Sequence, residues 1–153
     1  MSHYFDTPEG PAVERSIDVR FWDTGWTFTT ASGVFSYDGL DLGTGVLLRT
    51  HGPSASARRV LDLGCGWGVL AVALATAAPL AEVDAVDTNE RALALTRRNA
   101  DAHRVGERVR TLRPEDADDG VRYDEIWSNP PIRIGKDALH HLLLSWLPRL
   151  KPD

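Results

Sequence analysis

An asparagine and two prolines follow a short apolar run late in the chain, within "YDEIWSNPPIRIGK" at residues 123–136. Asn129 offers a neutral side-chain carbonyl, and Pro130 offers a backbone carbonyl with no competing N–H group of its own. A residue before proline is held in extended geometry, and Pro131 stiffens the segment further. The two carbonyls could therefore form a rigid fork that accepts hydrogen bonds from both N–H groups of an amine. Asn-Pro and Pro-Pro also mark ordinary turns, so the motif alone leaves both interpretations open.

A glycine-rich turn, "VLDLGCGWG" at residues 60–68, follows another apolar run and leads into a helical pattern. Gly64, Gly66 and Gly68 would permit positive φ and a close approach of a ligand to the backbone. Asp87 ends the next apolar run, 21 positions after Gly66 (87 − 66). This spacing is typical of the carboxylate that binds ribose hydroxyls in βαβ nucleotide sites.

Two features favour a cationic nucleoside ligand over a dinucleotide at this turn. The dinucleotide pattern G-x-G-x-x-G/A expects glycine or alanine where this chain has Val69. Asp62 adds a carboxylate beside the turn, which would repel a pyrophosphate and attract a cation. S-adenosylmethionine meets both conditions, because it combines a ribose, an ammonium group and a sulfonium without any phosphate. The alternative is that Asp62 is only a local cap or turn residue.

The remaining patterns predict the sheet that must position these residues. We expect strands at 58–63, 81–87, 108–112 and 123–127, helices at 68–78, 89–103 and 136–150, a hairpin at 16–30 turning at 23–25, and a further short strand at 33–36. Strands that alternate with helices indicate a parallel α/β sheet covered on both faces. Ligands of such sheets bind beyond the carboxyl ends of the strands, where all the motifs above are expected to lie.

The segments "VLDLGCGWGVLAVALA", "VDAVDTNERALALTRRNA" and "YDEIWSNPPIRIGK" resemble class I S-adenosylmethionine-dependent methyltransferases. With "TTASGVFSYDGLDLGTGVLL" at residues 29–48, the chain more narrowly resembles the small-domain family that includes bacterial small-subunit rRNA guanine-N2 methyltransferases. The resemblance implies a Rossmann-like, mostly parallel α/β sheet preceded by an N-terminal β-hairpin. We expect residues 1–36 to form an extension and hairpin packed on a cofactor-binding domain at 37–153.

The resemblance also implies roles for individual residues. Asn129, Pro130 and Pro131 would be catalytic. Residues that bind S-adenosylmethionine would be Thr44, Asp62, Gly64, Cys65, Gly66, Gly68, Asp87, Thr88, Asn89, Glu115, Asp116, Ala117 and Asn129. Residues that bind substrate would be Phe35, Ile132, Arg133 and Lys136. No metal ligand is implied. The plainer alternatives are core packing for Phe35, Cys65 and Trp67, and solvated surface positions for the charged residues.

These residues predict an S-adenosylmethionine-dependent N-methyltransferase that acts on an exocyclic amine, with guanine N2 in 16S rRNA as the leading substrate. The same tetrapeptide type serves DNA adenine and release-factor glutamine in related enzymes, so both stay alternatives. Ile132 stands where those enzymes often place an aromatic that stacks on a base. A non-catalytic S-adenosylmethionine- or RNA-binding module is a further alternative, whereas a nicotinamide-dependent oxidoreductase is disfavoured by Asp62 and Val69.

Composition sets outer limits on the function. The 153 residues suit one domain, and the net charge of −5 argues against strong non-specific binding of nucleic acid. Arginines gather between residues 97 and 113, where most are expected on a solvated helix face. No apolar run reaches the ~18 residues of a membrane helix, and the N-terminus has no signal-peptide pattern. With a single cysteine, these features predict a cytoplasmic protein whose partner is rRNA or the small ribosomal subunit.

The C-terminal end of the chain carries one more expectation. Family members continue beyond this point, so the last strands of the usual sheet are expected to be missing. The strand at 123–127 would then lie at a sheet edge, and exposed edges invite association. We therefore expect either a truncated chain or one that completes its sheet by forming a homodimer or binding another partner.

Overall fold

A four-stranded parallel sheet forms the centre of the computed structural model, which describes residues 7–36, 38–129 and 135–152. The strands are β3 (Arg59–Leu63), β4 (Glu82–Val86), β5 (Val109–Leu112) and β6 (Glu125–Ser128). Their order in the sheet is β5-β4-β3-β6, and each neighbouring pair is parallel. From β3, the strands β4 and β5 are added in turn on one side, and β6 is then added on the other side of β3. The Rossmann-like prediction is confirmed.

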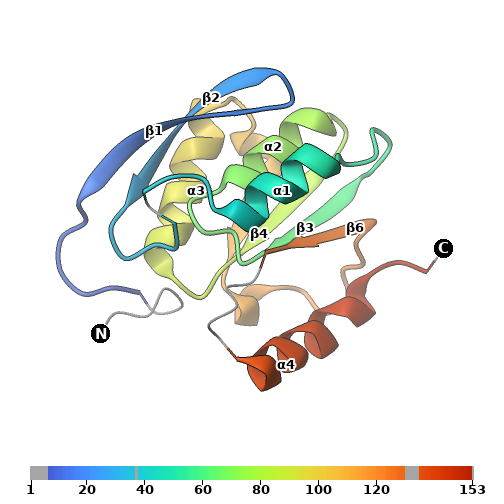
Figure 1. Ribbon diagram of the computed structural model, residues 1–153. Coiled ribbons are helices and arrows are strands. Elements are labelled where there is room, and N and C mark those ends of the chain that lie inside the picture. Colours follow the sequence, from blue (N-terminus) through green and yellow to red (C-terminus); the bar gives the residue numbers. More distant parts are fainter. Residues whose placement is uncertain (1–6, 37, 130–134, 153) are drawn as a thin grey trace.

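Helices cover both faces of this sheet (Figure 1). They are α1 (Leu42–Thr50), α2 (Val69–Ala77) and α3 (Glu90–Ala102) on one face and α4 (Lys136–Trp146) on the other. Successive residues of a strand point to opposite faces, so Val60 joins the core beneath α2, whereas Leu61 and Leu63 pack with Trp146 of α4. Short 3₁₀ turns follow at η1 (Gly106–Arg108), η2 (Pro114–Asp116) and η4 (Leu147–Arg149). Within the described segments, no helix has the length and apolar character needed to cross a membrane.

The predicted hairpin is present as β1 (Glu14–Phe21) and β2 (Thr24–Ala31), paired antiparallel. Its turn consists of Trp22 and Asp23, both with positive φ, and therefore begins one residue before the predicted turn at 23–25. Two-residue turns of this kind match the twist of the flanking strands. The buried aromatic residues of the hairpin, Phe21, Trp26 and Phe28, stack on one another and face α3 and the glycine turn.

Asn99 of α3 closes the free edge of β2. Its Oδ1 accepts from the Thr29 amide at 2.9 Å, and its Nδ2 donates to the Thr29 carbonyl at 2.9 Å, as a neighbouring strand would do. The same Nδ2 donates to the Trp67 carbonyl in the glycine turn at 2.6 Å. One buried amide therefore connects the hairpin, α3 and the turn that follows β3.

The predicted strand at residues 33–36 is wrong, because these residues form turns. Gly33 and Ser36 both have positive φ, which interrupts an extended chain. Pro8 packs so closely on Gly33 that an added Cβ would lie 2.6 Å from its ring. The Ser36 hydroxyl donates to the Gly39 carbonyl at 2.7 Å and holds the next turn.

Residues after α4 return to the edge of the sheet. The Tyr123 amide donates to the Arg149 carbonyl, and the Lys151 amide donates to the Tyr123 carbonyl, each at 2.8 Å. These two bonds form a parallel bridge between Tyr123 and Leu150, just before β6 begins. A parallel neighbour thus pairs with the segment just before β6. The division of the chain at residue 36 stays a prediction, as does association through this edge.

Candidate active site

The carboxyl ends of the four parallel strands bring the predicted motifs to one edge of the sheet. β3 and β6 are adjacent, with Leu63 opposite Ser128, so Gly64 and Asn129 leave the sheet side by side. The Ser128 hydroxyl fastens the two strand ends by donating to the Leu63 carbonyl at 3.0 Å. The strand order reverses at this pair, and such switch points are where open α/β sheets bind ligands.

The glycine turn after β3 divides into an open part and a packed part. Gly64 and Gly66 have φ of 81° and 55°, and nothing lies within 4 Å of the position that a Cβ would occupy on either. Gly68 has φ of 99°, but a Cβ there would lie 2.9 Å from the Thr96 Cα. The first two glycines therefore leave space for a ligand beside the backbone, and the third lets α2 pack against α3.

Asp87 links the tip of β4 to this turn. Its Oδ2 accepts from the Gly66 amide and its Oδ1 from the Asn89 amide, both at 2.9 Å. Burial raises the pKa of Asp87, and the backbone N–H groups that it accepts from offset part of this rise. Each carboxylate oxygen has a second lone pair, so the side chain can still accept from two hydroxyl groups. This arrangement suits the predicted ribose contact.

Asp62 lies beneath the pocket rather than in its wall. It is fully buried on the α2 side of β3, and neither carboxyl oxygen has a hydrogen-bond partner among the described residues. Burial raises its pKa to about 7, the negative charge of Asp87 adds to the rise, and the nearby Ala71 amide offsets some of it. An unpaired buried carboxyl group favours a positive ligand, and its contact with the cofactor stays a prediction.

Cys65 and Trp67 alternate with the glycines and point into the core. Cys65 is buried, and the Thr96 hydroxyl donates to its sulfur at 3.3 Å. Burial raises the pKa of the Cys65 thiol, and the charges of Asp87 and Asp62 raise it further. A neutral thiol is a poor nucleophile, so packing explains this residue better than covalent catalysis. Trp67 donates from Nε1 to the Ser36 carbonyl at 3.2 Å and supports the segment above the turn.

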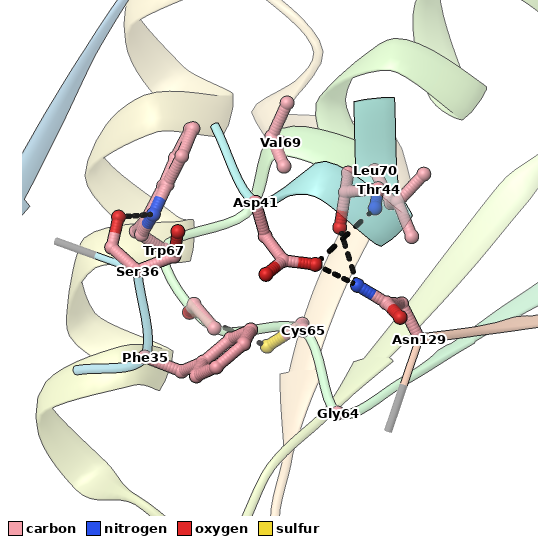
Figure 2. Close-up of a pocket in the computed structure, with 11 residues that line it drawn as sticks. Phe35, Ser36, Asp41, Thr44, Gly64, Cys65, Trp67, Val69, Leu70 and Asn129 are labelled. Atoms are coloured by element: carbon pink, nitrogen blue, oxygen red, sulfur yellow. Dashed lines mark hydrogen bonds between the residues drawn. The ribbon is translucent and has the colours of Figure 1, made fainter. Parts of the chain in front are cut away.

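Asn129 is held by Asp41, the N-cap of α1, and by Thr44 in the first turn of that helix. Its Nδ2 donates to Asp41 Oδ2 at 2.6 Å and to Thr44 Oγ1 at 2.9 Å (Figure 2). Thr44 was predicted at the site, but Asp41 was not. The only sequence signal at Asp41 is that of a helix N-cap, which the structure also shows, since its Oδ2 accepts from the amides of Gly43 and Thr44.

A pocket joins these parts (Figure 2). It is lined by Phe35, Ser36, Asp41, Thr44, Gly64, Cys65, Gly66, Trp67, Val69, Leu70 and Asn129. Of the substrate-binding residues predicted from the sequence, Phe35 is in this wall. No lysine or arginine among the described residues lines the pocket, and none of the described side chains forms a cluster of three or more potential metal ligands.

The other predicted site residues have varied positions. Asn89 is buried and caps α3, accepting from the Arg91 amide and donating to the Gly33 carbonyl. Thr88 is exposed at the tip of β4, and Lys136 is exposed at the start of α4. η2 contains Glu115 and Asp116 and is followed by Ala117, beyond the end of β5. Pro130, Pro131, Ile132 and Arg133 lie outside the described residues.

Most arginines between residues 97 and 113 are engaged within the molecule. Arg108 donates to three backbone carbonyls at the end of α2 and beyond, and Arg97 donates to the carbonyls of Gly106 and Val109. Arg98, Arg110 and Arg113 pair with carboxylates. The expectation of a solvated face is thus wrong for Arg97 and Arg108, which are half-buried and donate to backbone carbonyls of neighbouring segments. The cluster does not form a free basic patch.

The fold and the site together define a class I S-adenosylmethionine-dependent methyltransferase. The defining features are the parallel strand order, the open glycine turn, the carboxylate at the next strand tip and the amide at the switch point. The model of the methyltransferase small domain family matches residues 25–152. The chain belongs to this family. The family accounts for the Rossmann-like sheet and for the cofactor class that the sequence motifs predicted.

Curated relatives are similar to this chain at moderate sequence identity. The chain is 38% identical over 119 residues to ribosomal RNA small subunit methyltransferase C of Erwinia tasmaniensis, covering 75% of this chain and 34% of that protein. It is 29% identical over 141 residues to the uncharacterized protein YbxB of Bacillus subtilis, covering 90% of this chain and 70% of that protein. The chain therefore spans about a third of the length of the named methyltransferase.

A solved structure extends the likeness to nearly the whole chain. The T. thermophilus 16S rRNA N2 G1207 methyltransferase (RsmC), in complex with AdoMet and guanosine, superposes with a TM-score of 0.77 at 26% identity. The match covers 95% of this chain and 41% of RsmC. TrmN from Thermus thermophilus matches over 62% of this chain with a TM-score of 0.53 and 34% identity.

Proposed function

We propose that this chain transfers a methyl group from S-adenosylmethionine to an exocyclic amine, and that its substrate is guanine N2 in small-subunit rRNA. The observation that carries the proposal is the position of Asn129. Its amide leaves β6 beside the open glycine turn and lines the same pocket as Gly64 and Gly66. An acceptor for an amine N–H group thus lies next to the space for a cofactor.

The residues present fit S-adenosylmethionine. Gly64 and Gly66 leave open space beside the backbone, and Asp87 retains lone pairs for two ribose hydroxyls. The pocket contains Asp41, lies above the buried Asp62, and has no described basic side chain to hold a phosphate. This charge distribution favours a cation over a dinucleotide, because a pyrophosphate would be repelled. It supports S-adenosylmethionine against the nicotinamide alternative.

When bound, S-adenosylmethionine supplies an electrophilic methyl group on a sulfonium. The chain itself must hold the acceptor nitrogen in line with that methyl and stabilise the positive charge that develops on the nitrogen. Asn129 Oδ1 is a neutral acceptor suited to one N–H group of the amine, and it needs no prior loss of a proton. Pro130, which is outside the described residues, is proposed to supply the second acceptor through its backbone carbonyl.

The choice of guanine in rRNA rests on the relatives. RsmC, which carries guanosine and AdoMet in its solved structure, aligns with 95% of this chain. The named curated relatives are methyltransferases of small-subunit rRNA. Phe35 in the pocket wall is proposed as an aromatic surface for the base, because Ile132, being aliphatic, offers no aromatic ring for stacking. This substrate would place the protein's action in the cytoplasm.

A methyl-transfer panel tests the proposal. Purified small ribosomal subunits, free 16S rRNA, duplex DNA and release factor are each incubated with the protein and radiolabelled S-adenosylmethionine. Label is expected in rRNA, at N2 of a guanine after nuclease digestion and chromatography. Label in DNA adenine or protein glutamine alone would replace the proposed substrate with one of the two alternatives.

A matched variant tests the role of Asn129. Asn129→Ala should still bind S-adenosylmethionine in calorimetry but lose transfer by roughly a hundredfold or more, as expected for a preorganised transition-state contact. Asp87→Ala should instead weaken cofactor affinity, because it removes the ribose acceptor. Equal activity of Asn129→Ala and the unmodified protein would refute the mechanism. Cofactor binding without transfer to any substrate would favour the non-catalytic module.

A further inference from the structure

Besides its two helix-capping bonds, Asp41 has a contact that helix capping does not explain. As the N-cap of α1, its Oδ2 accepts from the backbone amides of Gly43 at 3.0 Å and Thr44 at 3.4 Å. The same oxygen also accepts from Nδ2 of Asn129 at 2.6 Å, a residue 88 positions later in the chain. This third bond is the shortest of the three, and it joins α1 to the tip of β6.

The contacts of Asn129 fix which way its amide faces. Nδ2 carries two hydrogens and has two acceptors, Asp41 Oδ2 and Thr44 Oγ1, within 2.9 Å. An ionised carboxylate only accepts hydrogen bonds, so the amide oxygen would be repelled from this position. Oδ1 is therefore turned away from the carboxylate, and no described residue donates a hydrogen bond to it. It is left as an acceptor for a ligand.

Gly43 completes the arrangement by leaving room. A Cβ at residue 43 would lie 2.6 Å from Asn129 Oδ1 and 3.0 Å from its Nδ2. Any side chain there would displace the amide from its two acceptors. The absence of a side chain at Gly43 thus gives the Asn129 amide room beside the first turn of α1.

We propose that Asp41 is a positioning residue for methyl transfer, a role that rests on the proposed function and deepens it. Its carboxylate holds the Asn129 amide with Oδ1 directed to the substrate amine. Because Nδ2–H donates to a full negative charge, the amide is polarised and Oδ1 becomes a stronger acceptor. That extra negative character counts most when positive charge develops on the nitrogen, so the contact should act on kcat more than on cofactor affinity.

Two substitutions separate this role from helix capping. Serine also caps helices well but is too short to keep the contact with Asn129, whereas asparagine keeps the cap and an acceptor oxygen and loses only the charge. Asp41→Ser should lower kcat roughly ten- to a hundredfold, the scale of a misplaced catalytic group. Its S-adenosylmethionine affinity and urea midpoint should stay close to those of the unmodified protein. Asp41→Asn should restore part of the lost kcat.

A double-mutant comparison of kcat distinguishes positioning of Asn129 from a purely structural role of Asp41. If Asp41 acts through Asn129, Asp41→Ser should cause no further loss in the Asn129→Ala background. A kcat for Asp41→Ser within twofold of the unmodified value would overturn the proposal. Equal losses in both backgrounds would do the same, because Asp41 would then act independently of Asn129.

An activity-independent measurement distinguishes failure of this inference from failure of the proposed function. In ¹H–¹⁵N spectra, the side-chain NH₂ resonances of Asn129, assigned by their disappearance in Asn129→Ala, should lie downfield of free amides. Asp41→Ser should move them upfield. Unchanged resonances would show that Asp41 does not hold the amide. If the resonances move but no substrate of the panel is methylated, the contact stands and the proposed function is what fails.

Discussion

Replacing Asp62 with asparagine should stabilise the protein, and the gain should grow with pH. Asp62 is fully buried in β3 with no hydrogen-bond partner among the described residues. Its protonated form is tolerated there, but its ionised form is not, which is why burial raises its pKa to about 7. Asparagine has nearly the same shape and never ionises, so it mimics the protonated acid at every pH.

The magnitude follows from linkage between protonation and folding. The unfolded chain releases this proton near pH ~4, and the folded chain holds it to about pH 7. Because the folded state binds more protons between these values, stability falls as pH rises through this window. Three pKa units correspond to about 4 kcal/mol in full, of which roughly 2–3 kcal/mol develops between pH 5 and pH 8.

Urea denaturation of the cofactor-free protein at several pH values measures this effect. The difference in unfolding free energy between Asp62→Asn and the unmodified protein should increase by roughly 2–3 kcal/mol from pH 5 to pH 8. A difference that does not change with pH would refute the reasoning, as would a variant that is less stable than the parent at pH 8. Either result would mean that the carboxylate has a strong partner, such as the start of α2.

Other substitutions test the packing around the site. Gly68→Ala should destabilise by about 2–4 kcal/mol, because its Cβ would meet the Thr96 backbone at positive φ, and urea midpoints would report this. Gly64→Ala, with open space around it, should cost only about 1–2 kcal/mol in stability but weaken S-adenosylmethionine binding in calorimetry. Asn99→Ala should cost about 3 kcal/mol by leaving three backbone groups unpaired, and protease cleavage of the hairpin should accelerate. Asp84→Asn, which breaks two ion pairs beneath α4, should destabilise by about 2 kcal/mol at pH 7, unlike Asp62→Asn.

The order of the main elements was predictable because it follows from local patterns. Apolar strands alternating with helices dictate parallel pairing, and the four strand tips then have to share one edge. The hairpin turn was less accessible to sequence reasoning. Asp23, Thr24 and Gly25 are all good turn residues, yet the turn is at Trp22 and Asp23. The register is set by burial of the aromatic residues on one face, and a slip of one residue would turn them to solvent.

Contacts between distant parts of the chain were not predictable. Asp41 and Asn129 are 88 positions apart, and each has an ordinary local explanation, a helix cap and a turn. Asn99 likewise appears in the sequence as one polar residue of an amphipathic helix, although its amide pairs with β2. Arg97 and Arg108 resembled surface charges because a sequence does not reveal which carbonyls lie within their reach. In each case the deciding partner comes from another element, so only the folded chain identifies the role.

The residues from which the sequence predicted a site are those that oppose stable folding. A carboxylate in an apolar strand, successive glycines at positive φ and an asparagine before two prolines all cost free energy or restrict the chain. Asp62 illustrates the exchange, because this unpaired carboxyl costs the cofactor-free protein stability as pH rises from ~4 to about 7, and a bound cation would recover that cost. Asp84, on the neighbouring strand β4, is also buried, but it pairs with two arginines and accepts from the Tyr123 hydroxyl, which shows the structural solution for a buried acid. A buried acid left unpaired beside an open glycine turn therefore remains the residue for which we predict a ligand contact, whereas a paired one is accounted for by the fold.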